Sequence, residues 1–390
     1  MRRRARWGSR RRAGGLLVCG ATAGVIVGLV PSCLRPAEDR TVRDEAVGRA
    51  ESPGLRVEVR DGLAAVRELE GGLVRLWASA PSIELELTFE PASGEAAGAP
   101  ELAAELPREV ELSVRNCMPE GTLTILAGEA QWSELPATLV TECRFRVVAS
   151  TSPLTLRVSE PLADTPGAFH FGVLSDIQEA IDRVGDVYRR VNEETHLSFV
   201  LGAGDLTEQG SREELERFQE ELEALALPYY TTLGNHELGA SGVPYYDYFG
   251  RGSFSFVYRD VRFTLLDSAS ATIDPRVYDW LNEWLQLGLQ QTHVVAMHIP
   301  PLDPTGVRNG AFASRNEATK LLGRLARGGV DLTLYGHIHS YYRFDNAGIP
   351  AHISGGGGAI PERFDALGRH FLDVRSDGRG VSGVRVVRVD

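Results

Sequence analysis

Six short apolar runs, each ending in polar residues, most constrain what the second half of this chain can fold into. They occupy residues 169–174, 197–203, 229–233, 261–266, 293–297 and 331–335. Amphipathic stretches lie between or after them, at about 180–194, 211–226, 275–290 and 315–328. Short apolar runs that alternate with helical patterns predict buried strands and covering helices. We therefore expect an α/β domain over residues 166–390, with its functional groups just beyond the carboxyl ends of the strands.

The region before this domain has a different period. Apolar and polar residues alternate over residues 55–59, 83–89, 110–114, 143–148 and 154–158, with Pro and Gly clusters between them. Alternation over five or six residues predicts half-buried antiparallel strands. We therefore expect residues 54–162 to form a small all-β sandwich. It contains no polar cluster typical of an active site, so a spacer or docking module is its default interpretation.

The first 33 residues have the composition of an export signal. Arginines concentrate between residues 2 and 12, and residues 13–32 carry no charge. Residues 30–33 resemble a bacterial lipobox, which would make Cys33 the lipidated first residue of the mature protein. A cleaved soluble form and a retained anchor remain alternatives, because about 20 apolar residues also span a bilayer. We expect an exported bacterial protein, in the periplasm or at the cell surface, held at the membrane by a lipid anchor or by this N-terminal segment.

Residues 34–53 are predicted to be a flexible tether. They are highly charged, they include prolines near both ends, and they show no apolar period. Such a segment has too few apolar side chains to offset the entropy of ordering its backbone.

Two of the four cysteines, Cys117 and Cys143, lie outside the export signal. They are 26 residues apart, in a region that would face an oxidising compartment. We expect a disulfide between them, because exported domains tolerate and benefit from such cross-links. Two independent buried thiols are the alternative. Neither cysteine has the spacing of a zinc site.

The charge balance limits the partners of the chain. Seven of the 41 basic residues precede residue 13, so the chain without residues 1–33 has 34 basic and 53 acidic residues, a net charge of −19. A body this acidic repels nucleic-acid backbones, and we expect no nucleic-acid partner.

Nearly every strand in the α/β region is followed by a residue that can bind a metal ion. Carboxylates, amide oxygens and imidazoles are ligands for first-row ions such as Mn, Fe or Zn. The candidates are Asp176 and Gln178 in SDIQ, Asp205 in GAGD, Asn235 and His236 in LGNHE, His298 in AMHIP, and His337 and His339 in YGHIH.

In this order and placement the motifs closely resemble those of the calcineurin-like metallophosphoesterase superfamily. The family pattern is D-x-H, GD, GNH followed by an acid, a later His, and GH-x-H, each after a strand. The resemblance covers about residues 168–390. It implies a four-layer α/β/β/α sandwich that hydrolyses a phosphomonoester or a phosphodiester of a small phosphorylated substrate.

The resemblance also implies a role for each residue. Asp205 would bridge two divalent or mixed-valence metal ions, with Mn favoured and Fe or Zn as alternatives. A hydroxide shared by the two ions would attack phosphorus. His236 would be the general acid for the leaving oxygen. Asp176, Gln178 and His339 would complete the first metal site, and Asn235, His298 and His337 the second.

Gln178 departs from the family pattern, which usually has His at this position. One interpretation is a functional amide ligand, as in the branch that resembles Mn-dependent ADP-ribose/CDP-alcohol diphosphatases and also shows D-I-Q. Carbonyl oxygen favours harder ions such as Mn. The other interpretation is a decayed first site, against which stand the intact Asp176, Asp205 and His339.

Two arginines after His298, Arg308 and Arg315, are candidates for binding a substrate phosphate, because a guanidinium can hold phosphate with two hydrogen bonds. Surface arginines are the alternative interpretation. The predicted function is an exported binuclear metal-dependent phosphoesterase. A nucleotide-diphosphate-type pyrophosphatase and a non-catalytic scaffold are its rivals.

Overall fold

The computed structural model describes residues 37–90, 107–306, 310–363 and 365–389. The predicted export signal and the lipidation site Cys33 lie outside these residues, and so does Arg308. Among the described residues, no helix has the length and hydropathy needed to cross a membrane.

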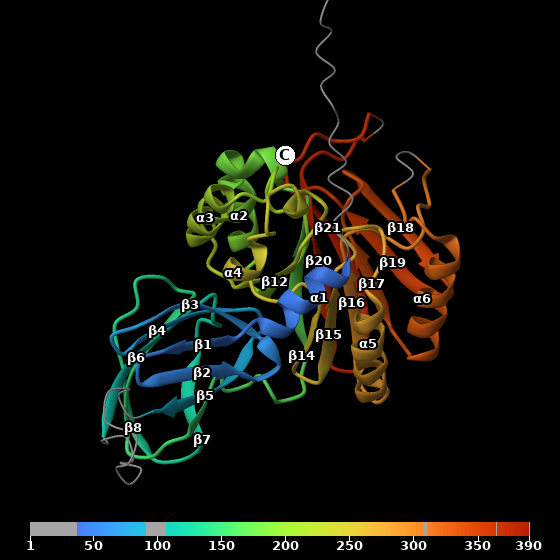
Figure 1. The fold of residues 1–390 in the computed structure, drawn as a ribbon. Coiled ribbons are helices and arrows are strands. Elements are labelled where there is room, and N and C mark those ends of the chain that lie inside the picture. Colours follow the sequence, from blue (N-terminus) through green and yellow to red (C-terminus); the bar gives the residue numbers. More distant parts are fainter. Residues whose placement is uncertain (1–36, 91–106, 307–309, 364, 390) are drawn as a thin grey trace, which may run out of the picture. The chain divides into compact units, whose positions relative to one another are not determined.

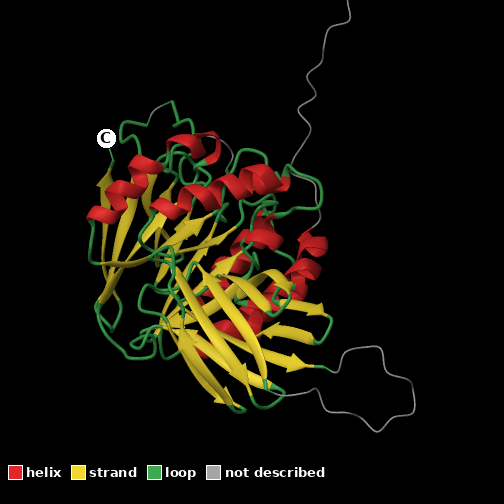
Figure 2. Ribbon diagram, turned by 90° about the vertical axis from the view of Figure 1, so that its left-hand side faces the viewer, coloured by secondary structure: helices red, strands yellow, loops and turns green. Residues whose placement is uncertain are grey.

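The first region is built from two five-stranded sheets, and Figure 2 shows it as strands joined by loops. Its apolar core contains Leu85 from one sheet and Leu112 and Val147 from the other, and along the strand that includes Leu85 buried and partly exposed residues alternate. The predicted sandwich is therefore present, with all five expected strands. One sheet has the order β1 (Arg49–Ser52), β2 (Leu55–Val59), β5 (Ser82–Phe89), β10 (Leu154–Ser159) and β7 (Thr122–Ala127); the other has the order β3 (Ala64–Glu70), β4 (Leu73–Ala78), β6 (Arg108–Arg115), β9 (Glu142–Ala149) and β8 (Ala130–Glu134).

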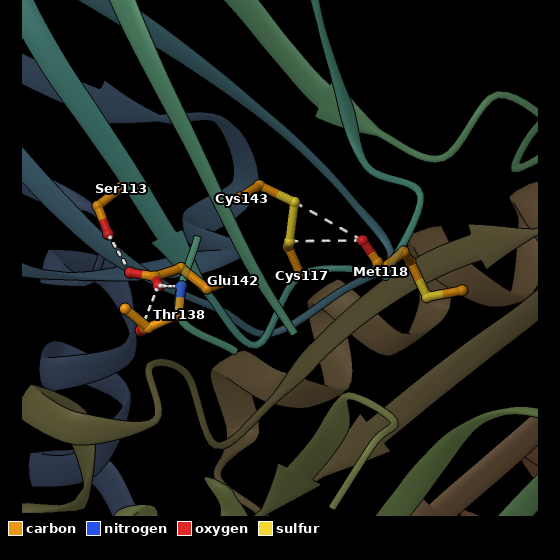
Figure 3. Close-up of a disulfide and its surroundings, with 6 residues drawn as sticks. All are labelled: Ser113, Cys117, Met118, Thr138, Glu142 and Cys143. Atoms are coloured by element: carbon orange, nitrogen blue, oxygen red, sulfur yellow. Dashed lines mark hydrogen bonds between the residues drawn. A yellow bond between two sulfur atoms is a disulfide. The ribbon is translucent and has the colours of Figure 1, made fainter. Parts of the chain in front are cut away.

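The expected disulfide between Cys117 and Cys143 is confirmed. It joins the segment after β6 to the start of β9, and both sulfur atoms lie near the carbonyl oxygen of Met118 (Figure 3). β6 and β9 are already paired in the sheet, and the Glu142 carboxylate of β9 also accepts a hydrogen bond from the Ser113 hydroxyl of β6 at 3.2 Å. The cross-link therefore reinforces a strand pair that already exists.

The second region contains two further sheets. The first has the order β13 (Tyr229–Thr232), β12 (Leu197–Ala203), β11 (Phe169–Leu174), β20 (His370–Ser376) and β21 (Val381–Arg388). The second has the order β14 (Phe254–Tyr258), β15 (Val261–Leu266), β16 (Thr292–Met297), β17 (Leu332–Tyr335), β19 (Ile349–Ser354) and β18 (Tyr341–Asn346). All six predicted strands are present within one residue of their expected ends.

Three apolar clusters fill the spaces between the two sheets and between each sheet and its helices. An aromatic cluster that includes Phe171, Phe199 and Phe263 lies between the sheets, and stacked or edge-on rings fill it. Figure 1 shows α2 (Gly185–Glu193) and α3 (Arg212–Glu221) on one side of the sheets and α5 (Pro275–Gly288) and α6 (Arg315–Arg327) on the other. Separate clusters line each helical layer. The four-layer α/β/β/α architecture is therefore confirmed.

Shorter helices complete the fold. They are α4 (Tyr245–Tyr248) and the 3-10 turns η1 (Arg60–Gly62), η2 (Gln178–Arg183), η3 (Leu222–Ala224) and η4 (His236–Leu238). Two of these turns, η2 and η4, begin at predicted site residues, so the chain turns tightly just where the strands end.

The flexible tether predicted for residues 34–53 is wrong where the structure describes it. Residues Ala37–Ala46 form helix α1 and Arg49–Ser52 form β1. The α1 guanidinium of Arg40 is 2% exposed and binds the Asp267 carboxylate through two nitrogens, at 2.6 and 3.0 Å. Asp44, also buried, accepts a hydrogen bond from the backbone N–H of Gly252 at 2.6 Å. The helix docks through charged side chains, and a search for apolar periodicity does not detect such a contact.

Candidate metal centre

The carboxyl ends of the parallel strands bring the predicted site residues together. β11, β12 and β13 run parallel in one sheet, and β15, β16 and β17 run parallel in the other. Each candidate follows one of these strands by only a few residues. Asp176 and Gln178 follow β11, Asp205 follows β12, Asn235 and His236 follow β13, His298 follows β16, and His337 and His339 follow β17.

Asp176, Asp205 and His339 form one group of possible metal ligands. Their ligand atoms all lie within 4.8 Å of one another, and all three side chains are buried. The Gln178 amide nitrogen lies in the same group, donating to Asp205 Oδ2 at 2.8 Å and lying 3.2 Å from His339 Nε2. A metal ion would bind the amide through its oxygen. To bind a cation, the Gln178 side-chain amide would therefore have to rotate so that its oxygen replaces its nitrogen in this position.

Asp205, His298 and His337 form the second group, again with ligand atoms within 4.8 Å. His298 Nε2 lies 3.1 Å from Asp205 Oδ2 and 3.1 Å from the side-chain oxygen of Asn235. The rings of His298 and His337 meet edge to face, with centroids 5.2 Å apart. Asp205 is thus shared by both groups, as expected of a bridging carboxylate.

Two histidines are oriented by backbone carbonyl groups. His298 Nδ1 lies 2.8 Å from the carbonyl oxygen of Ala203, and His339 Nδ1 lies 2.6 Å from that of Ile360. A ring that donates its Nδ1–H to a carbonyl leaves the Nε2 lone pair free to bind a metal ion. In both cases Nε2 faces the carboxylates. This arrangement is the usual one for histidine ligands.

The electrostatics of the cluster also fit cations. Burial alone would raise the pKa of Asp205, but the charges of His298 and His236 outweigh it and hold that pKa well below its usual range. Burial would lower the pKa of His298, but the Asp205 carboxylate raises it to about 9. Burial raises the pKa of Asp176. Two buried carboxylates with neighbouring imidazoles are stabilised in their ionised form by bound cations.

Four of the seven candidate ligands have a backbone conformation that residues other than glycine rarely adopt. The φ angles are 61° at Asp176, 50° at Gln178, 52° at Asp205 and 71° at His337. Such left-handed conformations carry an energetic cost and concentrate at functional sites, where the surrounding structure enforces them. Here they turn the side chains toward the shared centre.

Glycines in the motifs allow the loops to approach one another closely. A Cβ atom on Gly234 would lie 2.1 Å from Asp205 Oδ1, and one on Gly336 would lie 2.6 Å from Asp176 Oδ2. Both distances are below any real contact. The glycine of GNH and that of GHIH are therefore needed because the carboxylates occupy the space of their side chains.

Glu237 is a site residue for which the sequence analysis assigned no role. Its fully buried carboxylate accepts hydrogen bonds from the backbone N–H groups of Asp205, Leu206, Thr207 and Gly234, at 2.7–3.0 Å. It thus holds the loop after β12 against the loop after β13. The acid in LGNHE was visible in the sequence, but a carboxylate that binds mainly backbone N–H groups leaves no signal of its own there.

His236 lies beside the ligand groups and reaches solvent. Its side chain is 27% exposed, and its Nε2 lies 3.9 Å from Asp205 Oδ2. Its Nδ1 lies 2.7 Å from the carbonyl oxygen of Glu208, which fixes the ring. Burial would lower the pKa of His236, but the Asp205 charge and the Glu208 carbonyl raise it overall. The ring is therefore placed as a proton donor would be, and its neighbours favour the protonated form.

Of the two arginine candidates, the structure describes only Arg315 and does not bring it into this centre. Arg315 is the first residue of α6, and its side chain is exposed outside both ligand groups. Its prediction as a phosphate ligand gains no support. Arg308 lies outside the described residues.

The described residues thus form an α/β/β/α domain in which two ligand groups at the strand ends share the Asp205 carboxylate. Residues 169–341 match the family model described as calcineurin-like phosphoesterase. The resemblance seen in the motifs is therefore confirmed.

Three similar proteins illustrate the match. A 3',5'-cyclic-nucleotide phosphodiesterase of Nostoc sp. (strain PCC 7120) is 27% identical over 168 residues, 40% of this chain and 62% of the relative. The match thus spans less than two thirds of that relative. A dimetal phosphatase from Danio rerio has a TM-score of 0.45 and 17% identity, over 57% of this chain and 100% of the other. PhoD has a TM-score of 0.45 and 12% identity, over 79% of this chain and 86% of the other.

Proposed function

We propose that this protein is a metal-dependent phosphoric ester hydrolase that cleaves a phosphomonoester or a phosphodiester of a small molecule. The observation that carries the proposal is Asp205, a buried ionised carboxylate shared by two groups of nitrogen and oxygen ligands. Of the two esters we favour the diester, because the sequence relative is named as a cyclic-nucleotide phosphodiesterase.

The candidate ligands would hold two cations. Asp176, Gln178 and His339 would hold one cation, with Asp205 as the shared ligand. The second cation would be held by Asn235, His298 and His337. Two such cations supply Lewis acidity toward the phosphoryl oxygens and a strong nucleophile at neutral pH. We propose Mn²⁺ for the centre, because carboxylate and amide oxygens are prominent among the ligands.

His236 would donate a proton to the leaving oxygen. The Asp205 charge and the Glu208 carbonyl raise the pKa of the ring, which favours its protonated form, and its side chain is 27% exposed. The Glu208 carbonyl fixes Nδ1, so Nε2 is the nitrogen that can transfer the proton.

The test uses the full chain with p-nitrophenyl phosphate and bis-p-nitrophenyl phosphate, before and after chelation and again after Mn²⁺ is restored. We expect activity that disappears with the chelator and returns with the metal, with the diester hydrolysed faster. Asp205→Asn should abolish activity and most bound metal. Asp182→Asn removes an exposed carboxylate of the same type and is the matched control.

The rivals make different predictions in the same assay. Bound metal without turnover of either ester would favour the pyrophosphatase, which cleavage of a nucleotide diphosphate would then test. A chain that neither turns over nor binds metal would be the scaffold. Retention of two metal ions and full turnover in Asp205→Asn would refute the bridging role.

We also propose that the protein is exported and held at the membrane through Cys33. The arginine-rich start, the uncharged stretch after it and the lipobox-like residues support this proposal. The disulfide between Cys117 and Cys143 suits an oxidising compartment. Cys33→Ser should release the protein from the membrane fraction if the anchor is lipid. Unchanged membrane association would indicate a retained N-terminal segment instead.

A further inference from the structure

A second cluster of metal-binding side chains lies at the other end of the strands that carry the metal centre. His170 is the second residue of β11, His196 immediately precedes β12, and Asp373 lies within β20. Because β11 and β12 are parallel, their amino ends lie side by side, and His170 is in register with Leu197. β20 pairs with β11 on its other edge. Two side chains from β11 and β20 and one from the residue just before β12 therefore meet, away from the carboxyl ends where Asp176 and Asp205 lie.

The ligand atoms of this cluster lie close enough together to bind a single metal ion. They all lie within 4.8 Å of one another. His170 Nδ1 lies 2.8 Å from Asp373 Oδ1, and His196 Nε2 lies 3.1 Å from Asp373 Oδ2. Ligands at about 2.0–2.1 Å from a tetrahedral zinc ion are separated by about 3.3 Å. The two imidazole rings meet edge to face, with centroids 4.5 Å apart.

Two of the three side chains in this cluster remain accessible to an ion from solvent. The Asp373 side chain is 5% exposed, whereas those of His170 and His196 are 29% and 41% exposed. A buried carboxylate and two more accessible imidazoles form an open three-ligand site. Such sites keep a further position for water.

We propose that His170, His196 and Asp373 bind a zinc ion, separate from the dinuclear centre. Two imidazoles and one carboxylate suit a borderline ion such as Zn²⁺ better than Mn²⁺, which prefers oxygen ligands. The two sites would therefore select different metals in one chain. An ion here links the starts of β11 and β12 to β20, and it stabilises the folded chain by binding it and not the unfolded chain.

Arg385 is the feature that opposes this site. Its guanidinium donates to Asp373 Oδ2 at 2.8 and 3.2 Å and also contacts Glu194 at 2.7 Å. It competes with an ion for one oxygen of Asp373, while Oδ1 remains directed at His170. The guanidinium lowers the zinc affinity, and its removal should raise it. If Asp373 only held Arg385 in place and bound no ion, removal of Arg385 would leave zinc binding unchanged.

The experiment measures zinc binding to the Mn-loaded full chain by calorimetry and counts the metals by elemental analysis. We expect one zinc ion more than the dinuclear centre accounts for. His170→Gln and His196→Gln keep a hydrogen bond to Asp373 but remove the imidazole, and each should weaken zinc binding by about tenfold or more. Arg385→Gln should tighten it. Glu193→Gln, an exposed carboxylate nearby, is the matched control and should change nothing.

Phosphoesterase activity separates this proposal from the proposed function, because none of these variants touches the dinuclear centre. Loss of the extra zinc in both histidine variants, with Mn-dependent turnover retained, supports the site. An unchanged zinc count in both variants, or no extra zinc in the unaltered chain, would overturn it, whatever the activity. Weaker zinc binding in Arg385→Gln would also refute it.

Discussion

Replacement of Arg40 tests whether helix α1 is an integral part of the fold. The guanidinium is 2% exposed, makes two short contacts with Asp267 and donates to the Ser270 hydroxyl at 2.7 Å. Asp267 is itself 5% exposed. Arg40→Met therefore leaves a buried carboxylate without its charge partner. Breaking one side of a buried pair costs about 3–5 kcal/mol of unfolding free energy.

Arg43 provides the matched control on the same helix. Its ion pair with Asp247 has side chains that are 36% and 40% exposed, and such pairs contribute about 0–1 kcal/mol. Arg43→Met should therefore be nearly neutral. Asp267→Asn combined with Arg40→Met should be less destabilising than the two single changes added together, by about 1–3 kcal/mol.

Urea unfolding of the full chain measures these free energies, and limited proteolysis reports release of α1. A loss below about 1 kcal/mol in Arg40→Met, or equal losses in the Arg40 and Arg43 variants, would refute the reasoning. The helix would then be bound no more tightly than a surface segment, as the tether prediction supposed.

His236→Ala should slow esters with poor leaving groups by about 10²–10⁴ in kcat/KM while sparing nitrophenyl esters, and equal losses on both would indicate a binding role instead. Gln178→His should tighten metal binding at the first site and reduce the need for added Mn²⁺, and an unchanged metal affinity would mean that residue 178 is not a ligand. His293 is buried as the neutral ring, because burial lowers its pKa to about 4, so the stability it contributes is complete above pH 6.5 and is lost as the pH falls toward 4. Urea unfolding should show roughly 3 kcal/mol of this loss in the unaltered chain and a flatter profile in His293→Gln. Replacing Cys117 and Cys143 together by Ser should lower the unfolding free energy by about 3.5 kcal/mol for a closed loop of this length, and an unchanged urea midpoint would contradict that estimate.

The sequence predicts the core of the fold because buried parallel strands leave a direct signal. β11, β12 and β15 begin and end where their apolar runs do. Since chemistry in such sheets gathers at the carboxyl ends, locating the strands also locates the ligands. Neither step needs knowledge of the loops.

Two edge strands that were not predicted have weaker patterns. β18 is mostly half-buried and carries the exposed Arg343 and Asp345, and in β21 exposed and half-buried residues mix, with Val387 buried. Edge strands of this kind are held by hydrogen bonds to a neighbour, and their composition does not reveal them. Helix α1 was missed for the related reason that its docking residues, Arg40 and Asp44, are charged.

The metal centre depends on Glu237, a residue that is not itself one of the candidate ligands. The left-handed conformation of Asp205 carries an energetic cost that the surrounding structure must offset. Glu237 supplies part of that support, since its buried carboxylate binds the N–H of Asp205 and of the two residues after it. It also binds the N–H of Gly234, just before the Asn235 ligand. One side chain thus sets the position of the shared carboxylate relative to the second ligand group, because both loops are anchored to it.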